Sequence, residues 1–243
     1  MRPVGAELLK LRTTRLLLWL ALLILGLELL VITLHVFQDP LDTSAGPPQQ
    51  RADVGIAAVS ALISLILGIV ASAGEFTHGT IGQTFLATPV RERVLGAKLA
   101  AAAAAGAALG LASCAFAWGY AALLLRARSV PIHLGSGPTL RLVLGITLAA
   151  ALTGAFGIGF GSLLRRQTAA IVIALVWLLV GEPLLGLAQV ERYGPGHVVA
   201  AVVEAGNQAS DLLPFGASLA VGLLYIAVAG LLGGGSLRRA DIT

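Results

Sequence analysis

Apolar residues fill long stretches of this chain, and short polar connectors that carry arginine separate the stretches. Six stretches are about 20 residues long and lack the alternation of a β-strand, which predicts helices that cross a lipid bilayer. Helices satisfy their backbone polar groups internally, as a bilayer requires. We therefore expect an all-α membrane protein with six transmembrane helices. The expected spans are Leu16–Phe37, Val54–Gly74, Leu99–Leu125, Leu142–Leu164, Thr168–Gln189 and Pro214–Gly234.

The composition excludes an ordinary water-soluble fold. Apolar residues make up 57% of the chain and charged residues 12%, with a mean hydropathy of +0.92. So little charge could not cover the surface of a soluble protein. The first apolar stretch follows basic residues, as a signal peptide does. It is too long for a signal peptide and five more spans follow it, so we expect it to be retained.

The basic residues predict that both termini lie in the cytoplasm. In that orientation the inner side carries eleven basic residues and the outer side five, which is the usual bias. A re-entrant hairpin formed by the third and fourth stretches would change this count, but both stretches are long enough to cross. The inner set is Arg2, Lys10, Arg12, Arg15, Arg91, Arg93, Lys98, Arg165, Arg166, Arg238 and Arg239, and the outer set is Arg51, Arg126, Arg128, Arg141 and Arg192.

Net charge and cysteine content bear on the possible partners and on disulfide bonds. The net charge of +4 reflects the inner-face bias, and no aromatic-rich basic patch accompanies it, so we expect no nucleic-acid partner. Cys114 is the single cysteine and lies within an apolar span, which excludes an intrachain disulfide.

The segments outside the spans suggest two short accessory structures. Residues 1–15 mix apolar and basic positions and fit either an amphipathic helix on the inner leaflet or a plain basic flank, ahead of a transmembrane domain over 16–243. Residues 38–53, with several prolines, are expected to form an outer loop. The longer outer segment 191–213 contains an apolar stretch, His197–Ala205, that is too short to cross. We expect it to dip into the outer membrane interface in a re-entrant manner.

Glycine spacing predicts close helix contacts in two spans. Gly106 and Gly110 are four residues apart in the third span, and Gly157 and Gly161 are four apart in the fourth. Small residues at this spacing leave one stripe of a helix without side chains, which lets two backbones approach each other.

The connector between the second and third spans is the longest polar stretch on the inner face. Thr88 followed by Pro89 is a helix-start signal, and a helix that begins there could run through Lys98 into the third span. Upstream, Thr80–Leu86 could form about two turns of helix with Ile81, Phe85 and Leu86 on one face. Such a short helix could transmit movement from a soluble partner, or it could simply rest on the membrane.

Two sequence segments resemble the bacterial ABC type-2 permeases, the membrane subunits of ATP-binding cassette exporters. The first is Glu7-Leu8-Leu9-Lys10-Leu11-Arg12-Thr13-Thr14-Arg15 ahead of the first span. The second comprises Glu75, Gly79-Thr80, Leu86-Ala87-Thr88-Pro89-Val90-Arg91 and Gly96-Ala97-Lys98-Leu99, which is similar to the first cytoplasmic loop of that family. The six-span layout and the apolar segment before the last span are also similar.

The resemblance implies an exporter subunit of the bacterial inner (plasma) membrane that moves an amphipathic or hydrophobic substrate, such as a lipid, peptide or drug. It implies pairing with a second permease copy, identical or similar, and a coupling loop over 75–98 that docks on a cassette ATPase. ATP and magnesium would then bind to the partner subunit. The implied coupling residues are Glu75, His78, Thr80, Phe85, Leu86, Thr88, Pro89 and Arg91.

The residues support a separate ATPase independently of the resemblance. A phosphate-binding P-loop requires lysine followed by serine or threonine, whereas both lysines of this chain, Lys10 and Lys98, precede leucine. We see no catalytic constellation, so we expect a transport subunit that is not itself an enzyme. The four histidines are scattered and show no metal-ligand spacing, so no metal site is expected.

Two carboxylates fall within predicted spans. Glu28 lies in the first span, and Glu182 lies beside Pro183 in the fifth. A charge near the bilayer centre costs about 3 kcal/mol on insertion scales, so such groups face a partner or water. A partly hydrated structural position is favoured over contact with substrate. Two other functions stay open: a proton-coupled secondary transporter that uses one of these carboxylates, and a membrane scaffold protein. No internal repeat supports the former.

Overall fold

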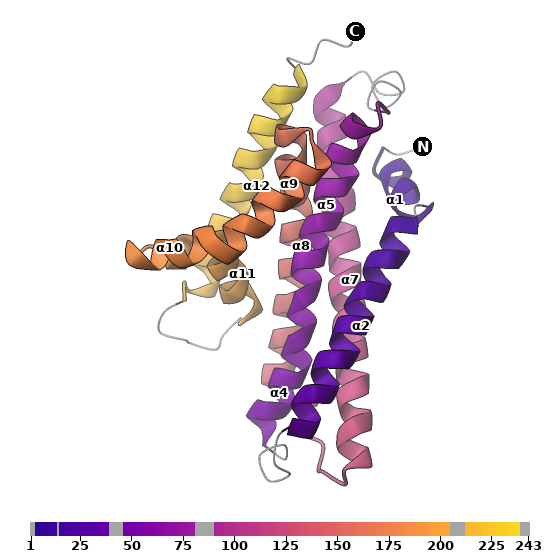
Figure 1. The fold of residues 1–243 in the computed structure, drawn as a ribbon, viewed down its shortest axis with the longest axis vertical. Coiled ribbons are helices and arrows are strands. Elements are labelled where there is room, and N and C mark those ends of the chain that lie inside the picture. The colour runs from indigo at the N-terminus through magenta and orange to yellow at the C-terminus, as the bar shows by residue number, and fades with distance from the viewer. Residues whose placement is uncertain (1–2, 14, 39–45, 81–89, 205–211, 239–243) are drawn as a thin grey trace.

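The computed structural model describes residues 3–13, 15–38, 46–80, 90–204 and 212–238, and Figure 1 shows their arrangement. Helix accounts for 88% of the structure, and no strand occurs in these ranges, which confirms the all-α prediction. The longer helices are α2 (Arg15–Gln38), α5 (Val59–Thr77), α7 (Arg91–Ala127), α8 (Gly137–Leu164) and α12 (Phe215–Arg238). Shorter ones are α1 (Pro3–Thr13), α4 (Pro47–Gly55), η1 (Ile56–Ala58), α9 (Gln167–Val176), η2 (Trp177–Gly181), α10 (Glu182–Leu187), η3 (Glu191–Tyr193) and α11 (Pro195–Val203).

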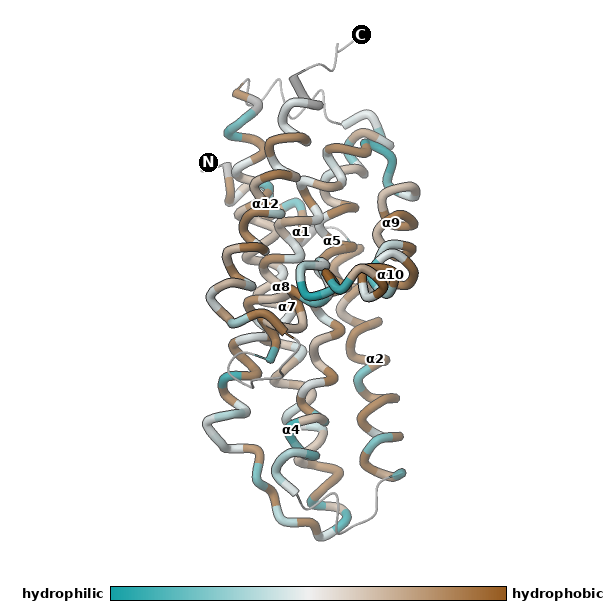
Figure 2. The backbone as a smooth tube through the Cα atoms, turned by 90° about the vertical axis from the view of Figure 1, so that its left-hand side faces the viewer, coloured by the Kyte–Doolittle hydropathy of each residue, from teal (hydrophilic) through white to brown (hydrophobic). Residues whose placement is uncertain are grey.

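Six helical stretches of the described chain are long and apolar enough to cross a membrane, and all six predicted spans are among them. Apolar side chains face outward on the peripheral helices α2, α9 and α12, whereas α5 and α8 are mostly buried inside the bundle. Brown, hydrophobic backbone runs along the helices in Figure 2. Helix α2 shows the reason, because its buried residues recur every fourth position from Leu20 to Val36 while most of its leucines are exposed. One stripe packs on the protein and the rest is left for lipid.

Helix α8 is the centre of the bundle, since it packs against α5, α7, α11 and α12. The predicted small-residue pairs make these contacts. A methyl group at Gly106 would collide with the backbone of Ala150 on α8, and one at Gly157 would collide with the carbonyl of Leu65 on α5. Only hydrogen side chains allow helices to approach this closely, which confirms the close contacts that the glycine spacing predicted.

The expected outer loop over 38–53 is partly helical. Helix α4 begins at Pro47 and continues through η1 into α5, so the second span starts seven residues before the predicted Val54. Proline was interpreted as a loop signal, but its fixed backbone angle and missing N–H also suit the first position of a helix. In this chain Pro47 is the first residue of helix α4.

The fifth apolar stretch is bent. Its α-helix widens into a π-helical segment, Trp177–Gly181, directly before Pro183, and α10 then leaves the bundle at mid-height in Figure 1. Proline cannot donate a backbone hydrogen bond and crowds the preceding turn, and π segments are a usual way to absorb that mismatch. The irregular turn therefore ends two residues before Pro183.

The start of α1, the end of α5, the start of α7 and the end of α12 all lie at the same end of the molecule (Figure 1). An even number of spans would bring both termini to one side, as the expected topology requires. We call this end the terminal end of the bundle. Its assignment to the cytoplasm stays a prediction from the basic residues.

Candidate functional site: a charged cluster at the terminal end

The predicted coupling residues surround the connection between α5 and α7. Glu75 lies in the last turn of α5, while His78 and Thr80 follow its end and are exposed. Helix α7 begins at Arg91 after an extended Val90, so the expected start at Thr88 and Pro89 is wrong by two residues. The helix then runs unbroken through Lys98 into the third span, as expected. The remaining coupling residues, Phe85, Leu86, Thr88 and Pro89, lie outside the described residues, as does most of the predicted helix Thr80–Leu86.

Helix α5 ends in a Schellman turn, which fixes the direction in which the chain leaves the membrane. The Thr80 N–H donates to the Glu75 carbonyl at 2.9 Å, and the Gly79 N–H donates to the Phe76 carbonyl at 3.3 Å. Gly79 has a φ of +68°, a left-handed conformation that glycine adopts without strain. The local sequence therefore ends α5 at Thr77.

Both lysines of the chain converge on Glu7 and Glu75 in this region. The buried Lys98 Nζ lies 3.1 Å from Glu7 Oε2 and 2.7 Å from Glu75 Oε1. Lys10 Nζ lies 3.0 Å from Glu7 Oε1 and 3.2 Å from Glu75 Oε1. These four residues, which we call the charged cluster, join α1, the end of α5 and the start of α7.

Mutual neutralisation stabilises the charged cluster. Burial is the largest single influence on Glu7 and would raise its pKa, but the charges and hydrogen bonds of Lys98 and Lys10 outweigh it and leave the pKa lowered. For Lys10, burial would lower the pKa, yet the bonds and charges of Glu7 and Glu75 leave it raised. Glu7 and Lys10 are therefore charged across the neutral pH range.

The structure pairs Glu75 with both lysines of the chain. The resemblance drew attention to Glu75, but spacing along the chain could not show that Glu7 and Lys10 of the N-terminal segment reach the same point. Residues 3–13 do form a helix, α1, with Leu11 buried against the bundle. It therefore packs on protein in addition to any contact with the membrane surface.

A cation–π contact ties the same end of α5 to a neighbouring turn. The Arg165 guanidinium lies 5.7 Å from the centre of the Phe76 ring. Arg165 sits in a left-handed conformation at the end of α8, where the chain turns into α9. The end of α5 is thus held by α1 and α7 through ion pairs and by the α8–α9 turn through an aromatic contact.

Glu182 has a structural role at the start of α11. Its buried Oε1 accepts a hydrogen bond from the His197 backbone N–H at 2.6 Å and lies 3.1 Å from the His197 Nδ1. A side chain on Gly194 would meet this carboxylate at 2.6 Å, and one on Gly196 would come closer still. Glu182 therefore supplies a hydrogen-bond acceptor at the N-terminus of α11, and it connects α10 to α11.

The Glu28 side chain of α2 lies close to α7 and η1. It is fully buried, its Oε1 forms a hydrogen bond with Ser113 of α7, and Ser113 Oγ is 3.2 Å from the Ala57 carbonyl. Its Oε2 has no hydrogen-bond partner within the described residues. Neighbouring helices enclose both intramembrane carboxylates, and the partial hydration expected for them stays a prediction.

The opposite end of the bundle contains a polar group that sequence analysis missed. His35 Nδ1 lies 2.6 Å from Asp53 Oδ1, and Gln49 Nε2 lies 3.1 Å from His35 Nε2. The buried Gln50 amide bridges to the connection after α7, donating to the Pro131 carbonyl at 2.8 Å. The missed signal was helix α4, because residues 49, 50 and 53 share a face only when that segment is helical.

Comparison with known proteins does not assign a family. No protein-family model matches the chain, and no curated protein matches it. Within the described ranges, no group of three or more histidine, cysteine, aspartate or glutamate side chains could hold a metal ion. The function of the charged cluster and of the connection between α5 and α7 is therefore inferred from geometry and sequence.

Proposed function

We propose that this chain is the membrane subunit of an ABC exporter of the bacterial inner membrane. It would pair with an identical or similar permease, and a separate cassette ATPase would hydrolyse ATP to move an amphipathic or hydrophobic substrate outward. The observation that carries the proposal is the connection between α5 and α7. Its sequence resembles the coupling loop of type-2 permeases, and ion pairs fix both of its ends.

The charged cluster gives that connection a mechanical rationale. A loop can transmit force from a soluble ATPase to membrane helices only if its ends move with those helices. Lys98 at the start of α7 and Glu75 at the end of α5 are 2.7 Å apart, and α1 covers the pair through Glu7. A push on the loop would therefore move α1, α5 and α7 together. Because α5 and α7 both pack on α8, the movement would reach the bundle centre.

The proposal can be tested by photocrosslinking in native membranes. A photoreactive amino acid replaces His78, an exposed residue in the connection, and in a matched variant it replaces Ile132, an exposed residue after α7. We expect the probe at position 78 to capture a protein that carries an ATP-binding cassette, and the probe at position 132 to capture none. A chain that captures no such ATPase from position 78, or captures it equally from both positions, would contradict the proposal.

A further inference from the structure

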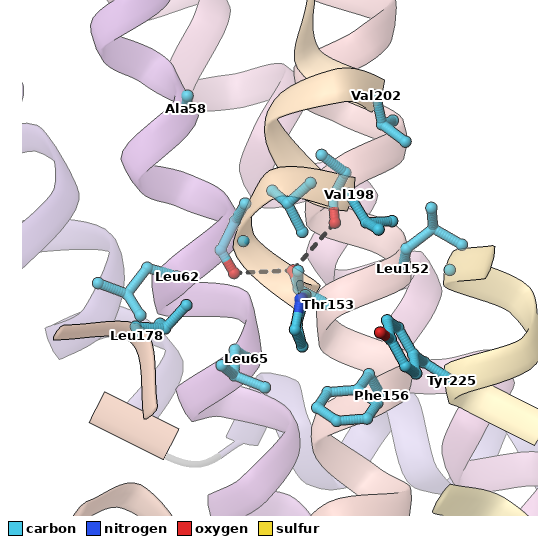
Figure 3. Close-up of a pocket in the computed structure, with 16 residues that line it drawn as sticks. Ala58, Leu62, Leu65, Leu152, Thr153, Phe156, Leu178, Val198, Val202 and Tyr225 are labelled. Atoms are coloured by element: carbon cyan, nitrogen blue, oxygen red, sulfur yellow. Dashed lines mark hydrogen bonds between the residues drawn. The ribbon is translucent and has the colours of Figure 1, made fainter. Parts of the chain in front are cut away.

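An apolar cavity of about 220 Å³ lies between α5, α8, α11, α12 and the π segment of the fifth span (Figure 3). Leu62, Leu65 and Leu178 lie on one side of it, and Leu152 and Tyr225 lie on the other. The short helix α11 contributes Val198 and Val202 and covers part of the cavity. The bend at Trp177–Gly181 contributes Leu178 to the lining, and α10 then runs away from the bundle (Figure 1).

The lining offers no free polar group to a ligand. No charged residue is among the lining residues. The Thr153 hydroxyl donates to the Ala61 carbonyl at 2.7 Å and also lies 3.0 Å from the Ala149 carbonyl. The Tyr225 hydroxyl donates to the Tyr193 carbonyl. With both hydroxyl hydrogens engaged in the protein, a polar headgroup would lose its hydrogen bonds on entering.

Size and surroundings point to hydrocarbon as the occupant. An apolar cavity of about 150 Å³ can stay dry and bind a benzene-sized molecule, because a buried water needs polar partners. The lining here is likewise apolar, so hydrocarbon suits this cavity better than water does. Its surroundings are also apolar, because Leu179, next to the lining residue Leu178, is 76% exposed and Leu223, next to the lining residue Gly222, is 57% exposed. These side chains face the lipid side of a membrane-spanning chain, so the cavity opens toward acyl chains.

We propose that this cavity binds one acyl chain of a bilayer lipid. The chain end inserts between α5 and α8, against the tilted ring pair of Phe156 and Tyr225, whose centres are 6.4 Å apart. The lipid headgroup stays outside. This binding does not depend on the proposed export function, because it requires neither an ATPase nor a second permease.

Gly222 provides a matched pair of variants. A methyl group there would lie 3.6 Å from Leu152 Cδ1 and 3.7 Å from Val198 Cγ1, which is ordinary contact, so Gly222→Ala should fold and leave most of the cavity open. Gly222→Phe places a ring in the cavity. Ala58→Phe fills it from the end of η1 and serves as a second, independent filling variant.

The test uses nanodiscs that contain phosphatidylglycerol with a photoreactive diazirine at the end of one acyl chain. We expect peptide mapping to find adducts enriched at residues 152–156 and 198–202 in the wild type and in Gly222→Ala. Either filling variant should reduce these adducts at least fivefold, while adducts on the exposed leucines of α2 stay unchanged. A lipid with the diazirine in its headgroup should not label these residues.

Three results would overturn the proposal. The first is chain-end labelling of residues 152–156 and 198–202 no stronger than that of the α2 leucines. The second is labelling that a folded filling variant leaves unchanged. The third is equal labelling by the headgroup probe, which would place polar lipid atoms in the cavity. The first and third outcomes are read on the wild-type chain, so they decide the matter even if both filling variants unfold.

Discussion

Glu182 connects two helices through a single carboxylate, and its surroundings leave little room for change. The carboxylate meets the start of α11 at Gly194 and Gly196, where a side chain would occupy its place. The Glu182 side chain of α10 therefore caps the N-terminus of a different helix, α11. The carboxylate is engaged by the His197 N–H, which supports a structural role over a mobile proton site.

Gly196→Ala and Glu182→Ala are expected to destabilise the protein by similar amounts, about 1 kcal/mol, because each removes the cap at α11. The two changes should not add in the double variant, since the second has nothing left to remove. Thermal unfolding in detergent measures all three variants. Gly216→Ala, on α12 with no atom within 4 Å of the added methyl, is the control and should be neutral. Full additivity would mean that the glycine and the carboxylate act separately.

Ser113→Ala should destabilise the bundle by about 1 kcal/mol, because it removes the hydrogen-bond partner of the buried Glu28 Oε1. Ser64→Ala is the matched control. The Ser64 hydroxyl is buried without a hydrogen-bond partner in the described structure, so its removal should be neutral or stabilising. Thermal unfolding again gives the comparison, and equal losses from the two serines would contradict the role assigned to Ser113.

Sequence analysis could identify the intramembrane carboxylates but not their partners. A charge in an apolar stretch is visible at once, and its cost predicts some compensation. The compensation comes from Ser113, 85 positions away, and from a backbone N–H 15 positions away. Both depend on how helices pack, which hydropathy does not encode.

At the level of elements, the charged cluster joins three helices with four side chains. Lys98 is buried and contacts both glutamates, whereas Lys10 makes its two contacts from a side chain that is 48% exposed. The two lysines therefore contribute unequally, since exposed ion pairs are worth little and buried ones cost more to break.

Lys98→Met is expected to destabilise the docking of α1 by roughly 1–3 kcal/mol and Lys10→Met by less than about 1 kcal/mol. Trypsin cleavage at Arg12 and Arg15 reports undocking directly and should accelerate more in Lys98→Met. The pH dependence follows from the lowered pKa of Glu7: its contribution is present above the ordinary glutamate value of about 4.3 and is lost as pH falls through the lower value in the folded protein. Docking that weakened between pH 6 and 8 would contradict this account.

The spans and their glycine contacts were predictable because hydropathy and small-residue spacing act within one helix. The bend of the fifth span was only partly predictable, since Pro183 marks a disturbance but not its direction. Helix α4 was missed because proline suits both loops and helix starts. Helix α11 lies in the apolar segment expected before the last span, and its place at the outer interface stays a prediction.

For the whole molecule, the main expectation is that the terminal end faces the cytoplasm. Single-cysteine labelling in a Cys114→Ala background tests this with a membrane-impermeant reagent. Cysteines at Gln49 and Asn207 should react from outside, and cysteines at Gly82 and Ala240 only after the membrane is opened. External labelling at position 82 would invert the layout and place the charged cluster on the wrong side for an ATPase.

The most direct test of the exporter assignment is the effect of Phe85→Ala on the partner ATPase. Phe85 is the largest apolar side chain on the predicted coupling helix, and a buried aromatic anchor is worth about 2 kcal/mol or more, which is about 30-fold in affinity. Copurification and substrate-stimulated ATP hydrolysis in proteoliposomes should both fall in Phe85→Ala, with membrane insertion unchanged. Glu75→Gln should have a milder effect, because Glu75 interacts with the lysines of this chain. Phe215→Ala, an exposed phenylalanine at the start of α12, should have none. Full association and full stimulation in Phe85→Ala would contradict coupling through this connection and remove the main support for an exporter subunit.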